Sequence, residues 1–213
     1  MTRRAFLRKV LPKASILSTL NIFKKHYQSI PLEIYGHDPF RALVSTLLSS
    51  RTRDETTFAV CERLFGKVHN FKELGQLEIR TIRNLIYPVG FYRTKAKNLK
   101  KTAQLLVNKY GSKVPHTIEE LTKLPGVGRK TANLILARSF GKATISVDTH
   151  VHKISNFLGW VKTKTPEQTE RELMKVIPKR YWREVNKLFV SIGRQYRSKQ
   201  KIINFFKEQG LIK

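Results

Sequence analysis

Hydrophobic residues recur along the chain every three or four positions, the spacing that places side chains on one face of an α-helix. The pattern predicts helices over residues 16–23, 39–48, 54–65, 79–86, 95–110, 132–140, 150–158, 167–177 and 182–196, with a short one after Thr117. Residues 143–147 have strand character, but the stretch is too short and isolated to build a sheet. We therefore predict an all-α protein.

Capping signals mark several helix ends. Asp38, followed by a proline, is a start signal, and Asp54 is a candidate N-cap for a helix that Gly66 ends. Thr117 and Glu120 have the spacing of a capping box. These signals agree with the hydrophobic period.

The chain shows no internal repeat, low-complexity tract or flexible linker. With 213 residues, 40% of them hydrophobic, it can bury one large core or two small ones. The weakest point is residues 141–146, and the segment from Asp148 onward can pack back against the N-terminal helix. We expect two helical lobes.

Residues 124–131, Leu-Pro-Gly-Val-Gly-Arg-Lys-Thr, predict a hairpin between two helices. Pro125 can stop a helix, Gly126 and Gly128 permit a tight turn at positive φ, and Thr131 resumes the helical pattern. A dinucleotide fold would need a third glycine and a preceding strand, which this segment lacks. The simplest alternative is a plain connection between packed helices.

Such a hairpin can also hold a phosphate. Its backbone can approach a polyanion closely, because the two glycines carry no side chains, and the next helix begins with outward-pointing N–H groups. Arg129 and Lys130 add two cations at the same edge.

The charge of the chain indicates its partner. Lysine and arginine number 42 against 15 acidic residues, giving a net charge of +27. Such an excess indicates nucleic acid. A membrane is the other candidate partner for a basic chain, but we expect none, since no run approaches the roughly 20 apolar residues of a span.

Residues 1–32 contain no acidic side chain, so an organellar transit peptide is an alternative to the basic arm and amphipathic helix that we favour. Cys61 is the only cysteine, which excludes a disulfide framework and a cysteine-based metal site. Cys61 shares a helical face with Phe58 and Phe65, which indicates a core position.

Asp148 follows Lys130 by 18 residues and directly precedes a helix. As an N-cap it is purely structural, although a capping carboxylate that faces a cleft can also be catalytic. His150 and His152 could form a metal site with Asp148, but residues two apart on a helix point away from each other. We therefore predict no metal site.

The hairpin sequence and the Val147-Asp148-Thr149-His150 segment together resemble the endonuclease III family of DNA glycosylases, in the helix-hairpin-helix superfamily with an essential aspartate. Further matches are Leu47-Leu48-Ser49-Ser50 with Thr52 and Asp54, Gly90-Phe91-Tyr92 with Lys95-Ala96, and Gly193-Arg194. The similarity runs from about residue 40 to 197.

The resemblance implies a six-helix barrel over residues 32–141 that contains the hairpin, and a second lobe from residues 1–31 and 142–213. It implies excision of damaged bases, typically oxidised pyrimidines, from double-stranded DNA. Bases inside the stack are unreachable, so such an enzyme must flip them out. We expect a DNA-associated intracellular monomer without a membrane partner.

By the same resemblance, Lys130 is the nucleophile that attacks C1′ of deoxyribose and forms a Schiff base, and Asp148 stabilises the positive charge that develops at C1′. Branches of the family that lack this lysine remove bases without efficient strand cleavage. We therefore expect a bifunctional glycosylase and abasic-site lyase in base excision repair. Taken alone, without the resemblance, Lys130 is better interpreted as a phosphate-contacting cation.

The expected DNA-binding residues lie in the hairpin and outside it. Arg51 stands where the family commonly has a glutamine that enters the gap left by the flipped base, and Phe91 could wedge the opposite side. Ordinary alternatives are a phosphate contact for Arg51 and core packing for Phe91. The full set is Pro125, Gly126, Val127, Gly128, Arg129, Thr131, Arg51, Phe91, Tyr92 and His150.

Most members of the family end with four cysteines that hold a [4Fe-4S] cluster. Here Arg197 stands near the first of those positions, and no cysteine follows it. We expect no cofactor and no cluster, with basic and apolar residues of 196–206 holding the C-terminal lobe instead. Alternatives for the whole protein are a non-catalytic DNA-binding module, a metal-dependent nuclease, or a glycosylase for mismatches or other lesions.

Overall fold

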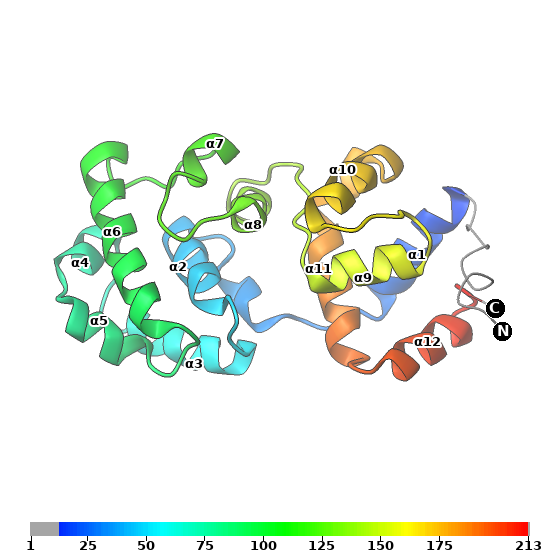
Figure 1. Ribbon diagram of the computed structural model, residues 1–213, viewed down its shortest axis with the longest axis horizontal. Helices are drawn as coiled ribbons and strands as arrows, with labels where there is room; N and C mark the ends of the chain where they lie inside the picture. The colour runs from blue at the N-terminus through cyan, green and yellow to red at the C-terminus, as the bar shows by residue number, and fades with distance from the viewer. Residues whose placement is uncertain (1–12, 213) are drawn as a thin grey trace. The chain divides into compact units, whose positions relative to one another are not determined.

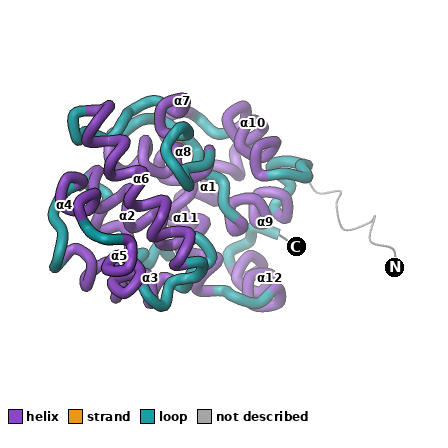
Figure 2. Tube along the Cα trace, turned by 60° about the vertical axis from the view of Figure 1, so that its left-hand side comes forward, coloured by secondary structure: helices purple, strands orange, loops and turns teal. Residues whose placement is uncertain are grey.

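The computed structural model describes residues 13–212, and every regular element there is a helix (Figure 1). The helices are α1 (Lys13–Lys25), η2 (Pro31–Tyr35), α2 (Pro39–Ser49), α3 (Asp54–Phe65), α4 (Phe71–Gln76), α5 (Ile79–Ile86), α6 (Tyr92–Tyr110), α7 (Ile118–Leu121), α8 (Arg129–Ser139), α9 (Thr149–Phe157), α10 (Pro166–Val176), η3 (Lys179–Tyr181), α11 (Trp182–Gln195) and α12 (Lys199–Glu208). The all-α prediction is confirmed, since residues 143–147 form no strand (Figure 2). None of the described helices is long and apolar enough to span a membrane.

The chain divides into two compact units. One consists of Pro31–Lys142 and the other of the described residues of Met1–Ile30 and Ala143–Lys213. Residues 1–12, which belong to the expected basic arm or transit peptide, lie outside the described part of the chain. Each unit buries its own hydrophobic cluster.

In the unit Pro31–Lys142, α4 and α5 pack against α6, and α2 packs against α3, α6 and α8. The core is aliphatic at its centre, where Leu43, Leu64, Ile82 and Leu99 are almost completely buried. Cys61 is also fully buried there, as its helical face predicted. Burial of these side chains is the main favourable term that holds the helices together.

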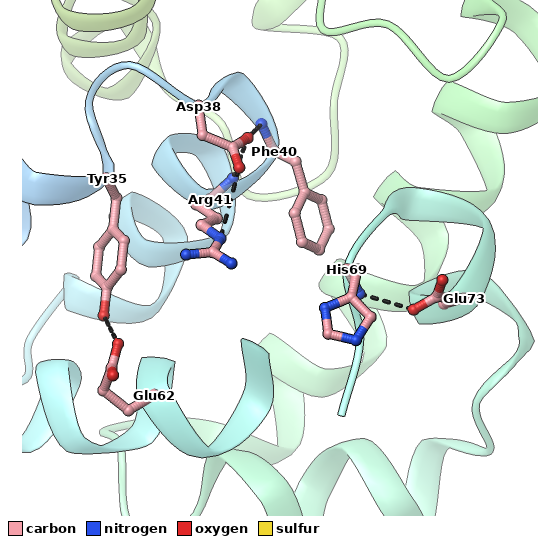
Figure 3. A network of polar contacts seen from close by, with 7 residues as sticks. All are labelled: Tyr35, Asp38, Phe40, Arg41, Glu62, His69 and Glu73. Atoms are coloured by element: carbon pink, nitrogen blue, oxygen red, sulfur yellow. Dashed lines mark hydrogen bonds and ion pairs between the residues drawn. The ribbon is translucent and has the colours of Figure 1, made fainter. Parts of the chain in front are cut away.

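Polar side chains fix the first helices of this unit (Figure 3). Asp38 Oδ1 accepts hydrogen bonds from the backbone N–H of Phe40 at 2.9 Å and of Arg41 at 3.2 Å, so Asp38 is the predicted N-cap of α2. The Tyr35 hydroxyl donates to Glu62 Oε1 at 2.6 Å. Burial and this bond to a carboxylate raise the pKa of Tyr35, which therefore stays protonated.

In the other unit, α1 and α9 pack on α11, and α10 packs on α9. An aromatic cluster fills its core. The Phe23 ring lies edge-on to Phe189 at 5.2 Å and stacks on Phe206 at 6.0 Å, measured between ring centroids. Tyr196 stacks on Phe205 at 4.3 Å. The two phenylalanines of α12 thus join the core that α1 and α11 form.

Several expected helix boundaries are wrong. Asp54 is the first residue of α3 and not its N-cap, a place that Arg53 takes without a side-chain hydrogen bond. Helix α6 begins at Tyr92 rather than Lys95, and α8 begins at Arg129 rather than three residues later. Thr117 does cap α7, since its Oγ1 accepts from Glu120 N at 3.3 Å.

Candidate functional site

The segment between α7 and α8 is a tight hairpin held to the core by its apolar residues. Leu124 and Val127 are buried, and Val127 N donates to Leu124 O at 3.0 Å. The Thr102 hydroxyl donates to Pro125 O at 3.2 Å. Because the Val127 side chain is buried and Pro125 is half-buried, these two residues offer mainly backbone to a ligand.

The two hairpin glycines have different roles. Gly126 has φ +85°, and a Cβ there would lie 3.0 Å from Asn98 Nδ2. Gly128 has φ −94°, so the expectation of positive φ is wrong for it. Gly128 is instead the N-cap of α8, exposed, with no atom within 4 Å of a Cβ built on it. This open space leaves the backbone at the start of α8 accessible to a ligand.

Arg129 and Lys130 are the first two residues of α8, and both are exposed. Thr131 follows and is half-buried. The N-terminal end of a helix carries partial positive charge. This charge and the two cations therefore coincide, an arrangement suited to an anion such as a phosphodiester.

Asp148 is the N-cap of α9, as predicted. Its Oδ1 accepts from His150 N and from Val151 N, each at 2.9 Å. Both capping bonds are made to Oδ1, so Oδ2 takes no part in capping the helix. The half-buried carboxylate is thus fixed in orientation by the helix it caps.

The two histidines of α9 point to different neighbours. The His150 ring lies so close to Gly193 of α11 that any Cβ at position 193 would collide with it. His152 Nδ1 is 2.6 Å from the Thr169 hydroxyl of α10. Among the described residues, no three histidines, cysteines or carboxylates are grouped to hold a metal ion.

Arg51 and Phe91 occupy the tips of two neighbouring turns in the unit Pro31–Lys142. Both have left-handed backbone, with φ of 52° and 57°. The Arg51 guanidinium carbon lies 5.2 Å from the centroid of the Phe91 ring, within cation–π range. Phe91 is 61% exposed, so core packing of Phe91 is wrong.

Tyr92 directly follows Phe91 and begins α6. Its half-buried ring packs edge-on against Tyr87 at 5.4 Å, and the Arg93 guanidinium lies 5.6 Å from its centroid. The ring therefore supports the turn beneath Phe91.

Lys95 is a residue of this region whose contacts the sequence did not reveal. Its ammonium donates to Leu48 O at 2.7 Å, to Ser50 O at 2.5 Å and to the Thr52 hydroxyl at 3.2 Å. Burial lowers the pKa of Lys95 to about 8. The acceptors lie more than forty residues before Lys95, and only the fold brings them together.

The unit that contains Ala143–Lys213, called the C-terminal unit below, does not fit an iron-sulfur cluster. Four thiolates are required, and the chain has only Cys61, which is buried in the other unit. Where the resemblance implies cluster ligands, Arg197 is followed by α12, whose Phe205 and Phe206 are buried.

A chain whose described residues form only helices, with two exposed glycines in a hairpin, cations at the start of the next helix and a net charge of +27, is a helix-hairpin-helix protein of the kind that binds DNA. Residues 44–179 match the family described as HhH-GPD superfamily base excision DNA repair protein. The chain belongs to this family.

Individual relatives agree with the family match. Endonuclease III of Thermotoga maritima is 49% identical over 158 residues, covering 74% of each chain. Endonuclease III-like protein 1 of Gallus gallus is 43% identical, over 73% of this chain and 57% of that protein. A trapped endonuclease III–DNA covalent intermediate has a TM-score of 0.78 at 32% identity, covering 89% of this chain and 90% of that one.

Proposed function

We propose that the protein is a bifunctional DNA glycosylase and abasic-site lyase of base excision repair, acting on damaged bases in double-stranded DNA. The observation that carries the proposal is Lys130, exposed in the first turn of α8 directly after the glycine hairpin. The family match includes both Lys130 and Asp148. Trapping of a covalent DNA intermediate on a similar endonuclease III supports a nucleophile on the protein.

In this proposal the neutral Lys130 amine attacks C1′ of the damaged nucleotide. The glycosidic bond breaks, and its electron pair leaves with the base, which takes up a proton. Opening of the sugar ring gives a protonated Schiff base between Nζ and C1′. Loss of a C2′ proton then expels the 3′ phosphate, and water hydrolyses the Schiff base to free the enzyme.

Asp148 stabilises the positive charge that develops at C1′ as the base departs. The capping bonds to Oδ1 support this role, because they orient the carboxylate and leave Oδ2 for other interactions. The same carboxylate helps to deprotonate the attacking amine. Asp148 is thus both a helix cap and a catalytic group.

The hairpin binds the DNA backbone. The exposed backbone at Gly126 and Gly128, with the start of α8, receives a phosphate, and the Arg129 side chain adds charge. Pro125 and Val127 contribute backbone, and Thr131 extends the same edge. These contacts position the strand without reading its sequence.

Arg51 and Phe91 act on the base stack. Phe91 inserts between bases, and Arg51 hydrogen-bonds the base left without a partner. The exposure of the Phe91 ring on a left-handed turn supports an intercalating role over a packing one. Tyr92 supports the Phe91 turn, and His150, adjacent to the Asp148 cap, contacts the DNA near C1′.

The reaction needs no redox or metal cofactor, and we propose that the aromatic packing of α12 replaces an iron-sulfur cluster in the C-terminal unit. The enzyme acts as a DNA-associated monomer. Oxidised pyrimidines are the proposed substrate class.

A panel of duplexes containing thymine glycol, dihydrouracil, uracil, 8-oxoguanine or an abasic site tests this function. Wild type should excise at least one oxidised pyrimidine and nick the abasic duplex in the presence of EDTA. Lys130→Ala and Asp148→Asn should each lose at least about 100-fold in rate. If no duplex separates wild type from these variants, the enzymatic proposal is wrong and a DNA-binding module remains. Loss of nicking on chelation would indicate a metal-dependent nuclease.

A further inference from the structure

Lys95 lies between the turns that carry Arg51 and Phe91 and bonds to both. Its ammonium donates to Leu48 O, Ser50 O and Thr52 Oγ1, on either side of Arg51. Its backbone N–H makes the first hydrogen bond of α6, to Phe91 O at 2.9 Å, so the ammonium ties the Arg51 turn to the helix that starts at the Phe91 turn. One residue therefore holds the two turns together.

A second set of contacts closes the junction. The Thr52 hydroxyl accepts from Gly90 N at 3.0 Å and donates to Ser50 O at 3.2 Å. A Cβ at Gly90 would collide with Arg51 O, so only glycine allows the turns to approach this closely. The Arg51 and Phe91 side chains then meet beyond this junction.

The backbone at both tips is strained. Left-handed conformation is unfavourable for a non-glycine residue and persists only where surrounding contacts impose it. Arg51 and Phe91 are two of three such residues in the described chain. The hydrogen bonds that Lys95 and Thr52 make between the two turns supply such contacts.

The environment of Lys95 is that of an ammonium held in one position by hydrogen bonds, rather than that of a solvated surface cation. Its three ammonium donors meet three neutral oxygen atoms, which uses all the donors of a lysine. Burial of an ammonium is unfavourable and lowers the pKa of Lys95.

We propose that Lys95 is a positioning residue that preforms Arg51 and Phe91 as one two-pronged wedge before DNA binds. This inference rests on the proposed function, since it assigns Lys95 a role in opening the duplex. Preforming matters because turns that must be ordered on binding reduce the free energy available for unstacking. Without Lys95 the tips relax from their left-handed conformation, and the Phe91 ring is no longer held for insertion.

The test is a double-mutant cycle between Lys95 and Phe91, read as the single-turnover rate of base excision from a thymine glycol duplex. Lys95→Met keeps the aliphatic stem and removes the donors. Lys100→Met is the matched control, because Lys100 is on the same helix and its ammonium donates to the single carbonyl of Leu77 at 2.7 Å. Thr52→Val is a second, milder variant of the same junction.

We expect Lys95→Met to lower the rate about tenfold and Lys100→Met to lower it less than about twofold. Phe91→Ala should lower the rate in wild type but change it less than about twofold in the Lys95→Met background, because the wedge is already lost there. A purely structural role for Lys95 would give independent, multiplicative losses. That result, or a Lys95→Met rate equal to that of Lys100→Met, overturns the inference.

A fluorescence measurement covers the case in which Lys95→Met is globally destabilised. With 2-aminopurine opposite the lesion, binding of wild type should raise fluorescence as this base is unstacked, and Thr52→Val should reduce the rise at saturating protein. An unchanged rise with Thr52→Val contradicts the preformed wedge. Absence of excision by wild type would instead mean that the proposed function has failed.

Discussion

At the scale of single residues, this protein places strain and charge where its proposed chemistry needs them. Asp148 serves as a cap through one oxygen, Gly128 leaves a helix start open, and Phe91 is exposed on left-handed backbone. The left-handed backbone of Phe91 and its exposed ring depart from what would be most stable for the fold alone, whereas the Asp148 cap also stabilises its helix. Such departures concentrate at functional sites.

The sequence revealed these residues unevenly. Asp148 was predictable as a cap because the N-cap preference is local. Gly128 was wrongly expected at positive φ, because glycine permits that conformation without requiring it. Lys95 was noted only as part of a matching motif, and its contacts could not be predicted, since its partners are distant along the chain and lysine is usually a solvated surface residue.

Cys61 gives a prediction at this scale. Its thiol is fully buried, and burial raises its pKa to about 12, so the reactive thiolate is scarce near neutral pH. Iodoacetamide at pH 8 should leave native protein unlabelled and label one site after denaturation in guanidinium, as followed by intact mass. Stoichiometric labelling of the native protein would show that Cys61 is accessible.

At the scale of helices, hydrophobic period and caps predicted most elements but not their starts. The start of α6 was missed because its N-cap, Phe91, has left-handed backbone and makes no capping hydrogen bond, so no capping residue marks the start in the sequence. Helices α4 and α12 were not predicted: α4 has only six residues, and α12 follows a run rich in basic residues that gives little helical pattern. Tertiary burial of Phe205 and Phe206 explains α12.

Helix α12 gives the prediction at this scale. Phe206 is completely buried and stacks on Phe23, so Phe206→Ala should lower the free energy of unfolding by about 3–5 kcal/mol. Lys207→Ala, at the exposed neighbouring position, should change it by less than about 0.5 kcal/mol. Urea denaturation followed by circular dichroism measures both. Equal effects would mean that α12 is not docked through its aromatic face.

At the scale of the whole molecule, a net charge of +27 favours association with a polyanionic partner. The charge was plain from composition, as was the hairpin from its glycines and proline. The reaction was predicted only from the family resemblance, because neither the hydrophobic periodicity nor the charge of the chain specifies chemistry at C1′. The family match agrees with that reading.

The iron content of the purified protein is a prediction for the whole molecule. One cysteine cannot provide four thiolate ligands, so protein isolated from cells grown with ample iron should be colourless and contain no stoichiometric iron. Visible absorbance and iron assay measure this. Iron at about four atoms per chain would require ligands other than cysteine and would overturn the proposed aromatic replacement.

The central claim is that Lys130 is the nucleophile, and borohydride trapping tests it most directly. Reduction of the Schiff base should link wild type covalently to an abasic duplex, and peptide mapping should locate the adduct on Lys130. Lys109→Ala, which removes an exposed lysine of α6, should trap like wild type, whereas Lys130→Ala should give almost no adduct. An adduct at wild-type yield from Lys130→Ala, or one mapped to another residue, would contradict the account.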